Sequence, residues 1–169
     1  MKGKGAQIVS TYTVRMAQEE TVVLSAADVR RLMDTGNGDL FLSIHHNAAA
    51  NKNSNGVETY IVTPGGAASS NDKEEQIHKK SVSANCYDTV NIRLAALIQQ
   101  NMVRKTAAAD RGVRFARFRV LALSQLPGAL IEAGFVSHPA EELQCGSAQR
   151  QRKIAEAIAD AVTRLNSNQ

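Results

Sequence analysis

Two adjacent histidines are the first candidates for catalysis or metal binding in this sequence. His45 and His46 end the apolar run that begins at Leu40, and this run predicts a buried strand over 39–47. Successive strand side chains point to opposite faces, so only one of the two imidazoles faces a given site. Open α/β sheets bind ligands beyond the carboxyl ends of their strands. The pair therefore indicates either a metal ligand, zinc being a common partner of imidazole, or ordinary hydrogen bonding at a turn.

Glu132 is the second candidate, because it is the one charged residue in the apolar segment 127–136. A carboxylate in a buried strand is rare without a partner. Burial would raise its pKa, as a general acid or base working near neutral pH requires. A structural ion pair with Arg111 or Arg117 is the alternative. Arg111 itself, in the turn at 110–113, fits either an anionic substrate group or a turn cap.

Other kinds of chemistry lack their motifs. The sequence contains neither Gly-x-Ser-x-Gly nor Gly-x-Gly-x-x-Gly, so serine hydrolysis and nucleotide binding are not indicated. Cys86 and Cys145 form no Cys-x-x-Cys pair. The net charge of +4 favours polyanionic partners, but aromatic residues make up only 4% and Trp is absent, which argues against a nucleic-acid partner.

The elements that must position these residues alternate between strand and helix. We expect strands at 8–12, 39–47, 57–62, 114–123 and 129–136, a short helix after Ser25, and mostly loop over 67–88. Two amphipathic helices are expected to present Leu94 and Met102, and Ile154 and Leu165, on their apolar faces. At 169 residues this pattern predicts one α/β domain with helices on both faces of the sheet. We expect no secretory leader and no membrane-spanning segment.

Four segments occur in an order typical of one enzyme family: 39–48 (DLFLSIHHNA), 56–60 (GVETY), 110–113 (DRGV) and 130–137 (LIEAGFVS). Together they resemble the zinc-dependent N-acetylmuramoyl-L-alanine amidases over roughly residues 8–165. The resemblance implies a single domain with a mixed, mostly parallel sheet and helices on both faces. It also implies hydrolysis of the amide between N-acetylmuramic acid and L-alanine of peptidoglycan, outside the cytoplasm.

The resemblance assigns roles to both candidates. It implies Zn²⁺ held by two histidines and one glutamate, with His45 as the last histidine ligand. Glu132 matches the catalytic glutamate, which acts as general base on a zinc-activated water. The first histidine and the ligand glutamate of the family have no match here, and His138 stands where asparagine is common. We therefore expect residues 1–169 to be the C-terminal portion of the catalytic domain, truncated at its N-terminal side.

Two other functions remain open at the level of sequence. A chain with one recognisable zinc ligand fits a catalytically incompetent fragment, or a metal-free module that binds peptidoglycan or regulates its hydrolysis, because catalytic zinc normally has three protein ligands. A basic nucleic-acid binder is the third and least favoured alternative, and it would show a steep salt dependence of binding.

Overall fold

The computed structural model describes residues 38–70 and 80–166, and these form a layered α/β structure around one four-stranded sheet. The strands are β1 (Phe41–Asn47), β2 (Val57–Ile61), β3 (Asp110–Phe115) and β4 (Gly128–Phe135), in the order β1-β4-β2-β3. The pairs β1/β4 and β2/β3 are parallel, and β2/β4 is antiparallel. The prediction of a mixed, mostly parallel sheet is confirmed.

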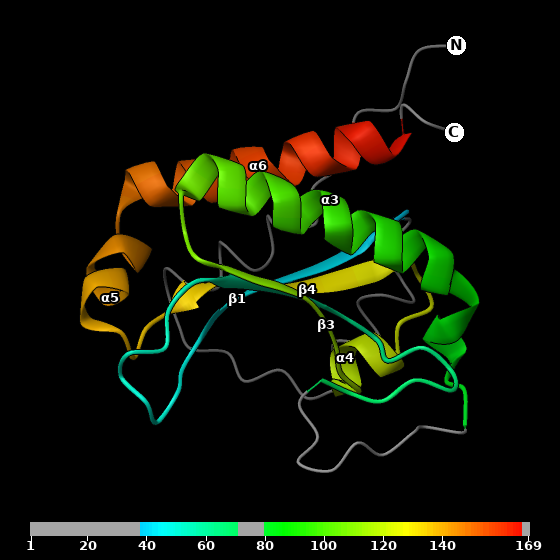
Figure 1. Ribbon diagram of the computed structural model, residues 1–169. Coiled ribbons are helices and arrows are strands. Elements are labelled where there is room, and N and C mark those ends of the chain that lie inside the picture. The colour runs from blue at the N-terminus through cyan, green and yellow to red at the C-terminus, as the bar shows by residue number, and fades with distance from the viewer. Residues whose placement is uncertain (1–37, 71–79, 167–169) are drawn as a thin grey trace, which may run out of the picture.

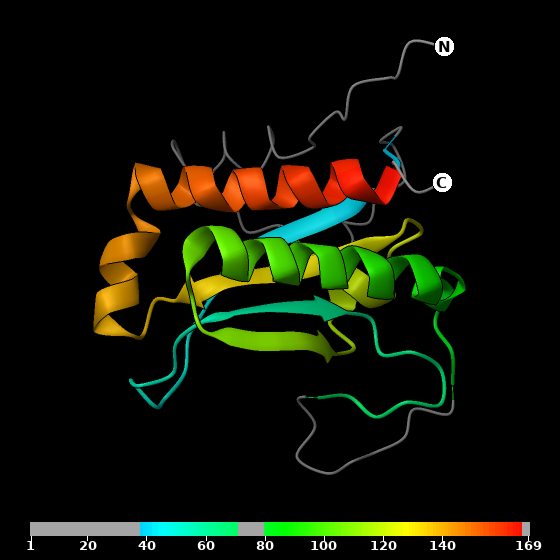
Figure 2. The same cartoon turned by 45° about the horizontal axis from the view of Figure 1, so that its top comes forward.

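Two long helices lie side by side on one face of this sheet (Figures 1 and 2). They are α3 (Asp88–Thr106) and α6 (Ala148–Asn166). Their apolar stripes meet the β-branched residues of the central strands, and the resulting core includes Leu94, Ile98, Ile131 and Ile158. The stripes predicted from the sequence are confirmed, since their spacing of three to four residues puts these side chains on one side of each helix.

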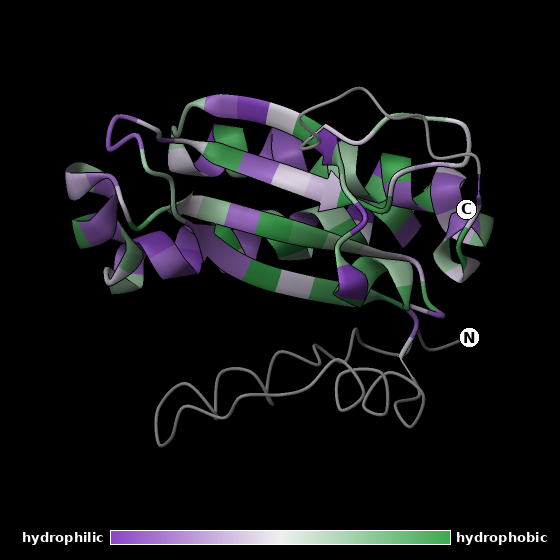
Figure 3. Cartoon of the chain, turned by 90° about the horizontal axis from the view of Figure 1, so that it is seen from below, coloured by the Kyte–Doolittle hydropathy of each residue, from purple (hydrophilic) through white to green (hydrophobic). Residues whose placement is uncertain are grey.

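The opposite face of the sheet is covered by short elements. The 3-10 helix η1 (Ser83–Tyr87) and the helix α4 (Arg119–Ala122) pack near one end, around Tyr60, Leu121 and Leu130. Helix α5 (Pro139–Cys145) follows β4. Figure 3 views the sheet from this side and shows hydrophilic positions among hydrophobic ones along the strands. Helices thus lie on both faces, as predicted. The two long helices cover the other face, and only short elements lie on this one, which we call the open face.

Two of the expected strands differ from the structure. The strand predicted over 114–123 is wrong beyond Phe115, because β3 spans Asp110–Phe115 and α4 occupies part of the remainder. The strand β1 was expected to be buried, yet none of its seven residues is, since it lies at an edge of the described sheet. The strand expected at 8–12 and the helix after Ser25 lie outside the described residues.

The remaining elements agree with the sequence. Strands β2 and β4 fall within a residue of their predicted bounds, and α6 buries Ile154 and Leu165, the two residues predicted for its apolar face. Among the helices that the structure describes, none combines the length and apolar character needed to cross a membrane.

Candidate active site

Three side chains line up across three neighbouring strands on the open face of the sheet. His45 of β1 lies opposite Glu132 of β4, and Glu132 lies opposite Glu58 of β2. Residues directly opposite one another on paired strands point to the same face, with their Cβ atoms roughly 5 Å apart. The structure therefore brings together the two residues that the sequence singled out, and it adds a second carboxylate.

Glu132 is partly buried, and its Oε2 atom has no hydrogen-bond partner in the structure. Burial raises the pKa of Glu132 to about 7, and the negative charge of Glu58 contributes in the same direction. No ion pair links Glu132 to Arg111 or Arg117 within the described part of the chain: Arg111 pairs with Glu58, and Arg117 donates to the carbonyl of Lys80. The structural ion pair considered as an alternative for Glu132 is thus not what the structure shows.

His45 and His46 point to opposite faces of β1, as strand geometry requires. The exposed His45 has its Nε2 atom 2.7 Å from Ser43 Oγ. Partial burial lowers the pKa of His45, which favours the neutral imidazole that binds metals. His46 lies away from the site; burial first, and then the positive charge of Arg150, lower its pKa.

Glu58 is the functional candidate that the sequence reasoning missed. Its side chain is 2% exposed, yet it has four polar partners. Asn47 Nδ2 and Tyr60 OH donate to Oε1 at 2.7 and 3.1 Å, and Arg111 Nε donates to Oε2 at 2.9 Å. Arg114 Nε lies 3.0 Å from the same oxygen as an ion pair. The sequence signal that could have found Glu58 is the same as for Glu132: it is a lone carboxylate in an apolar strand.

A bulge in β3 places both arginines on the face of Glu58. The register advances two residues on β2, from Val57 to Thr59, while β3 advances three, from Asp110 to Val113. Gly112 supplies the positive φ of +82° within this segment. Because the extra residue reverses the normal alternation, Arg111 and Arg114 face the same way although they are three positions apart.

The end of β4 next to the site is fixed by contacts with α5. Glu141 accepts hydrogen bonds from the backbone N–H groups of Phe135 and Gly56, at 2.7 and 3.0 Å. His138 caps α5, with Nδ1 accepting from the N–H of Glu141 at 3.4 Å. This explains how histidine can stand where the resembling family usually has asparagine, since both side chains can accept this bond.

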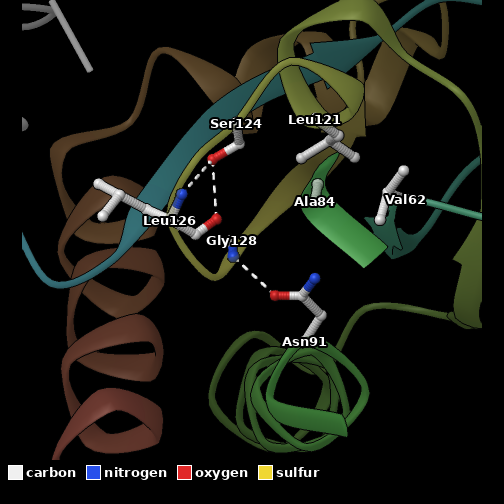
Figure 4. A pocket seen from close by; sticks show the side chains of 7 residues that line it. All are labelled: Val62, Ala84, Asn91, Leu121, Ser124, Leu126 and Gly128. Carbon is white, nitrogen blue, oxygen red and sulfur yellow. Dashed lines mark hydrogen bonds between the residues drawn. The ribbon is translucent and has the colours of Figure 1, made fainter. Parts of the chain in front are cut away.

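A small hollow elsewhere in the molecule is not the candidate site. It lies between Asn91 of α3, Leu121 of α4 and Gly128 at the start of β4 (Figure 4). Asn91 Oδ1 accepts a hydrogen bond from the N–H of Gly128 at 2.8 Å, so the polar group at this hollow serves the fold. The titratable side chains gather instead on the open sheet face.

The arrangement on the open face puts a carboxylate with a raised pKa next to an imidazole, which is a possible metal donor, but such donors are few there. In residues 38–70 and 80–166, no group of three His, Cys, Asp or Glu side chains lies close enough together to hold a metal ion. Catalytic zinc sites use three protein ligands. His45 fits one such position, and the described residues do not complete the set.

The chain resembles several amidases in sequence and structure. It is 34% identical over 122 residues to the N-acetylmuramoyl-L-alanine amidase LytC of Bacillus subtilis, which covers 72% of this chain and 20% of LytC. It is 26% identical to AmiC of Neisseria meningitidis over 174 residues, or 90% of this chain and 42% of AmiC. An N-acetylmuramoyl-L-alanine amidase from Clostridium difficile 630 superimposes with a TM-score of 0.69 at 25% identity, covering 89% of this chain and 70% of that one.

The chain spans one fifth of LytC and less than half of AmiC. The likeness to the solved Clostridium difficile amidase extends over most of the sheet and helices described above. Residues 4–164 match the family model Amidase_3, described as N-acetylmuramoyl-L-alanine amidase, and the chain therefore belongs to this family.

Proposed function

We propose that the chain is a catalytic part of a peptidoglycan amidase that hydrolyses the amide between N-acetylmuramic acid and L-alanine, with Glu132 as the proton-transferring residue. The observation that carries this proposal is the pairing of Glu132 with His45 across β4 and β1. It puts a carboxylate with an unpartnered oxygen beside an imidazole whose pKa is lowered by burial, on the open face of the sheet. Membership of the amidase family supplies the bond that is cleaved.

The environment of Glu132 suits a residue that first takes and then returns a proton. With its pKa raised to about 7, the carboxylate can accept a proton from an attacking water and give it to the leaving amine at neutral pH. A general base matched to the working pH contributes roughly 10²- to 10⁴-fold to the rate. Glu58 on β2 contributes to this raised pKa, because its negative charge opposes ionisation of Glu132.

Zinc is the metal that the family implies, and we propose His45 as one of its ligands. Bound zinc would polarise the substrate carbonyl and lower the pKa of a water. The exposed imidazole of His45 fits a ligand position, whereas the rest of the described donor set does not complete a site.

The substrate determines where the protein works. Peptidoglycan lies outside the cytoplasmic membrane, so we propose an extracytoplasmic site of action. The net charge of +4 favours association with an anionic cell-wall polymer.

Incubation of the purified chain with cell-wall sacculi and Zn²⁺ tests the activity directly. Cleavage of the proposed bond releases peptides with a new alanine amino terminus, which amine labelling and mass spectrometry detect. Glu132→Gln keeps the size of the side chain but cannot accept the proton. We expect it to lower the rate about 100-fold or more.

Glu142→Gln is the matched control, because Glu142 is an exposed glutamate of α5, and it should leave the rate unchanged. His45→Ala should lower both the bound zinc, measured by atomic emission, and the rate. Full activity of the Glu132→Gln protein would overturn the assignment of the base.

A second function is favoured by the incomplete donor set in the described residues. A metal-free module that binds peptidoglycan would remain on sacculi in a sedimentation assay without bound zinc and without release of alanine amino termini. Turnover that depends on zinc would exclude this module. Sedimentation, zinc content and amine release from one protein sample therefore separate the two functions.

A further inference from the structure

Arg111 and Arg114 form a cationic pair beside the row of His45, Glu132 and Glu58. Both guanidinium groups contact one oxygen of Glu58 through their Nε atoms, at 2.9 and 3.0 Å. One buried negative charge thus faces two positive charges. The cluster formed by Glu58, Arg111 and Arg114 has a net charge of +1, next to a site where Glu132 must approach the substrate.

The terminal nitrogens of both arginines are left over by these contacts. Within the described part of the chain, neither Arg111 nor Arg114 has a hydrogen bond or ion pair from an Nη atom. The two side chains remain 31% and 32% exposed. Arg111 also lies over the ring of Phe135, with its Cζ atom 4.8 Å from the ring centroid. The guanidinium group of Arg111 is therefore held by Glu58 at Nε and by the ring of Phe135 on one of its flat faces, and its two Nη atoms are available to a ligand.

Such a fork fits a carboxylate. A planar guanidinium donates two parallel N–H bonds to a carboxylate, and these charge-assisted bonds are among the stronger ones in proteins. Two neighbouring guanidinium groups, fixed by Glu58 in advance, lose less side-chain freedom when a ligand binds. The geometry is that of a preorganised anion site.

The position of the pair along a substrate can be estimated from the sheet. Strand β3 lies two strand spacings from β4, roughly 10 Å, and the guanidinium groups reach back about one spacing towards Glu132. An extended peptide advances roughly 3.5 Å per residue. The pair thus lies roughly 5 Å from Glu132, so a peptide that runs across the strands from Glu132 towards β3 brings a carboxylate one to two residues beyond the cleaved amide within reach.

We propose that Arg111 and Arg114, positioned by Glu58, bind a free carboxylate on the second residue of the stem peptide and so select acidic over amidated peptides. This inference rests on the proposed amidase function for the identity of the substrate. It assigns to Arg111 the anion-binding role that the sequence left open. The bulge in β3 contributes to this role because it turns both arginines to one face.

Binding of a soluble peptide tests this without requiring turnover. The probe is N-acetyl-L-alanyl-γ-D-glutamyl-L-lysine, with the glutamyl α-carboxyl group either free or amidated, and binding to the full chain is measured by isothermal titration calorimetry. We expect the free acid to bind about tenfold or more tightly than the amide. Arg111→Gln or Arg114→Gln should each reduce that ratio several-fold, and the double variant should bring it close to one.

Folding and charge need separate controls, because Arg111 and Arg114 also neutralise Glu58. Arg111→Lys retains a positive charge but has no fork, so it should keep the fold by circular dichroism and still lose part of the preference. Arg152→Gln removes an exposed arginine of α6 and should leave the ratio unchanged. An equal ratio in the wild type and the folded Arg variants would overturn the inference.

The result also separates this inference from the proposed activity. Carboxylate-dependent binding without hydrolysis of sacculi would support the arginine site and count against the amidase function. Hydrolysis of sacculi with no preference between the two peptides would do the reverse. Absence of both binding and hydrolysis would overturn both.

Discussion

Glu132 and Glu58 are carboxylates on adjacent strands, yet their surroundings differ. Glu58 forms ion pairs with two arginines and accepts hydrogen bonds from two neutral donors, whereas Oε2 of Glu132 has no partner in the structure. The low solvation of Glu132 and the nearby charge of Glu58 both favour its protonated form. At the scale of the residue, this contrast supports the proposed proton transfer at Glu132 rather than at Glu58.

Replacing Glu132 should therefore stabilise the protein at alkaline pH. Its pKa is raised from 4.5 to about 7 in the folded chain, so the folded state binds the proton more tightly than the unfolded state does. Ionisation destabilises the fold progressively between about pH 4.5 and pH 7. Glu132→Gln should raise the free energy of unfolding at pH 8 by on the order of 1–3 kcal/mol.

Urea denaturation of the metal-free chain at pH 4 and pH 8 checks this prediction. The wild type and the variant should be similar at pH 4, where Glu132 is protonated. A variant that is less stable than the wild type at pH 8 would contradict the burial of Glu132 as the source of the shift.

Glu58→Gln should move the titration of Glu132 to lower pH. The substitution removes a negative charge opposite Glu132 and leaves the positive charges of Arg111 and Arg114 in place. NMR titration of the side-chain carboxyl carbons in the metal-free chain measures the midpoint, with Glu132→Gln used to assign the signal. Glu142→Gln should not move it, and an unchanged midpoint in Glu58→Gln would show that burial alone sets the pKa.

At the scale of the element, the alignment of His45 with Glu132 depends on close contact between β1 and β4. A Cβ atom on Gly128 would lie 2.6 Å from the carbonyl oxygen of Phe41, at the pair where the register of the two strands begins. Gly128→Ala should destabilise the fold by roughly 1–3 kcal/mol and lower the proposed amidase activity. Gly146→Ala is the control, since its Cβ meets nothing within 4 Å.

Thermal unfolding and amine release from sacculi measure the two effects of Gly128→Ala. If this variant matched the stability of Gly146→Ala, the close approach of β1 to β4 at Phe41 would not be a constraint on the site.

The bulge in β3 is the second element that shapes the site. Gly112 has a φ of +82° and open space around its Cβ position, so conformation rather than crowding restricts this residue. Gly112→Val should cost roughly 1–2 kcal/mol and weaken the preference for a free carboxylate. Gly112→Asn should be milder, because asparagine tolerates positive φ more readily; equal effects of both variants in urea denaturation and calorimetry would argue against the bulge.

At the scale of the whole molecule, apolar packing rather than charge holds α3 and α6 against the sheet. Ile98 is fully buried between these layers, whereas Lys105 and Asp160 form an ion pair at 3.0 Å near the surface. Ile98→Ala should lower the free energy of unfolding by about 2–5 kcal/mol. Asp160→Asn should change it by less than about 1 kcal/mol. Urea denaturation that ranked the two variants in the opposite order would contradict this division.

The amino-acid sequence alone determined the family and most of the elements, and it indicated His45 and Glu132 as candidate site residues. Neighbouring residues in the sequence are enough to predict these features, because apolar periodicity and short motifs are properties of consecutive residues. The same locality explains the error after Phe115, where α4 (Arg119–Ala122) occupies part of the β-prone segment 116–123. Its packing against β4 and η1 outweighs the propensity of a short segment.

Tertiary structure decided what surrounds those two residues. Glu58 and Arg114 became candidates only when strand register placed them beside Glu132 and Arg111, although 74 positions separate Glu58 from Glu132 in the numbering of the sequence. Register and bulges depend on backbone pairing between distant segments, which no local pattern specifies. The sequence thus indicates two candidate residues for the proposed reaction, and the fold supplies the charges and contacts that surround them.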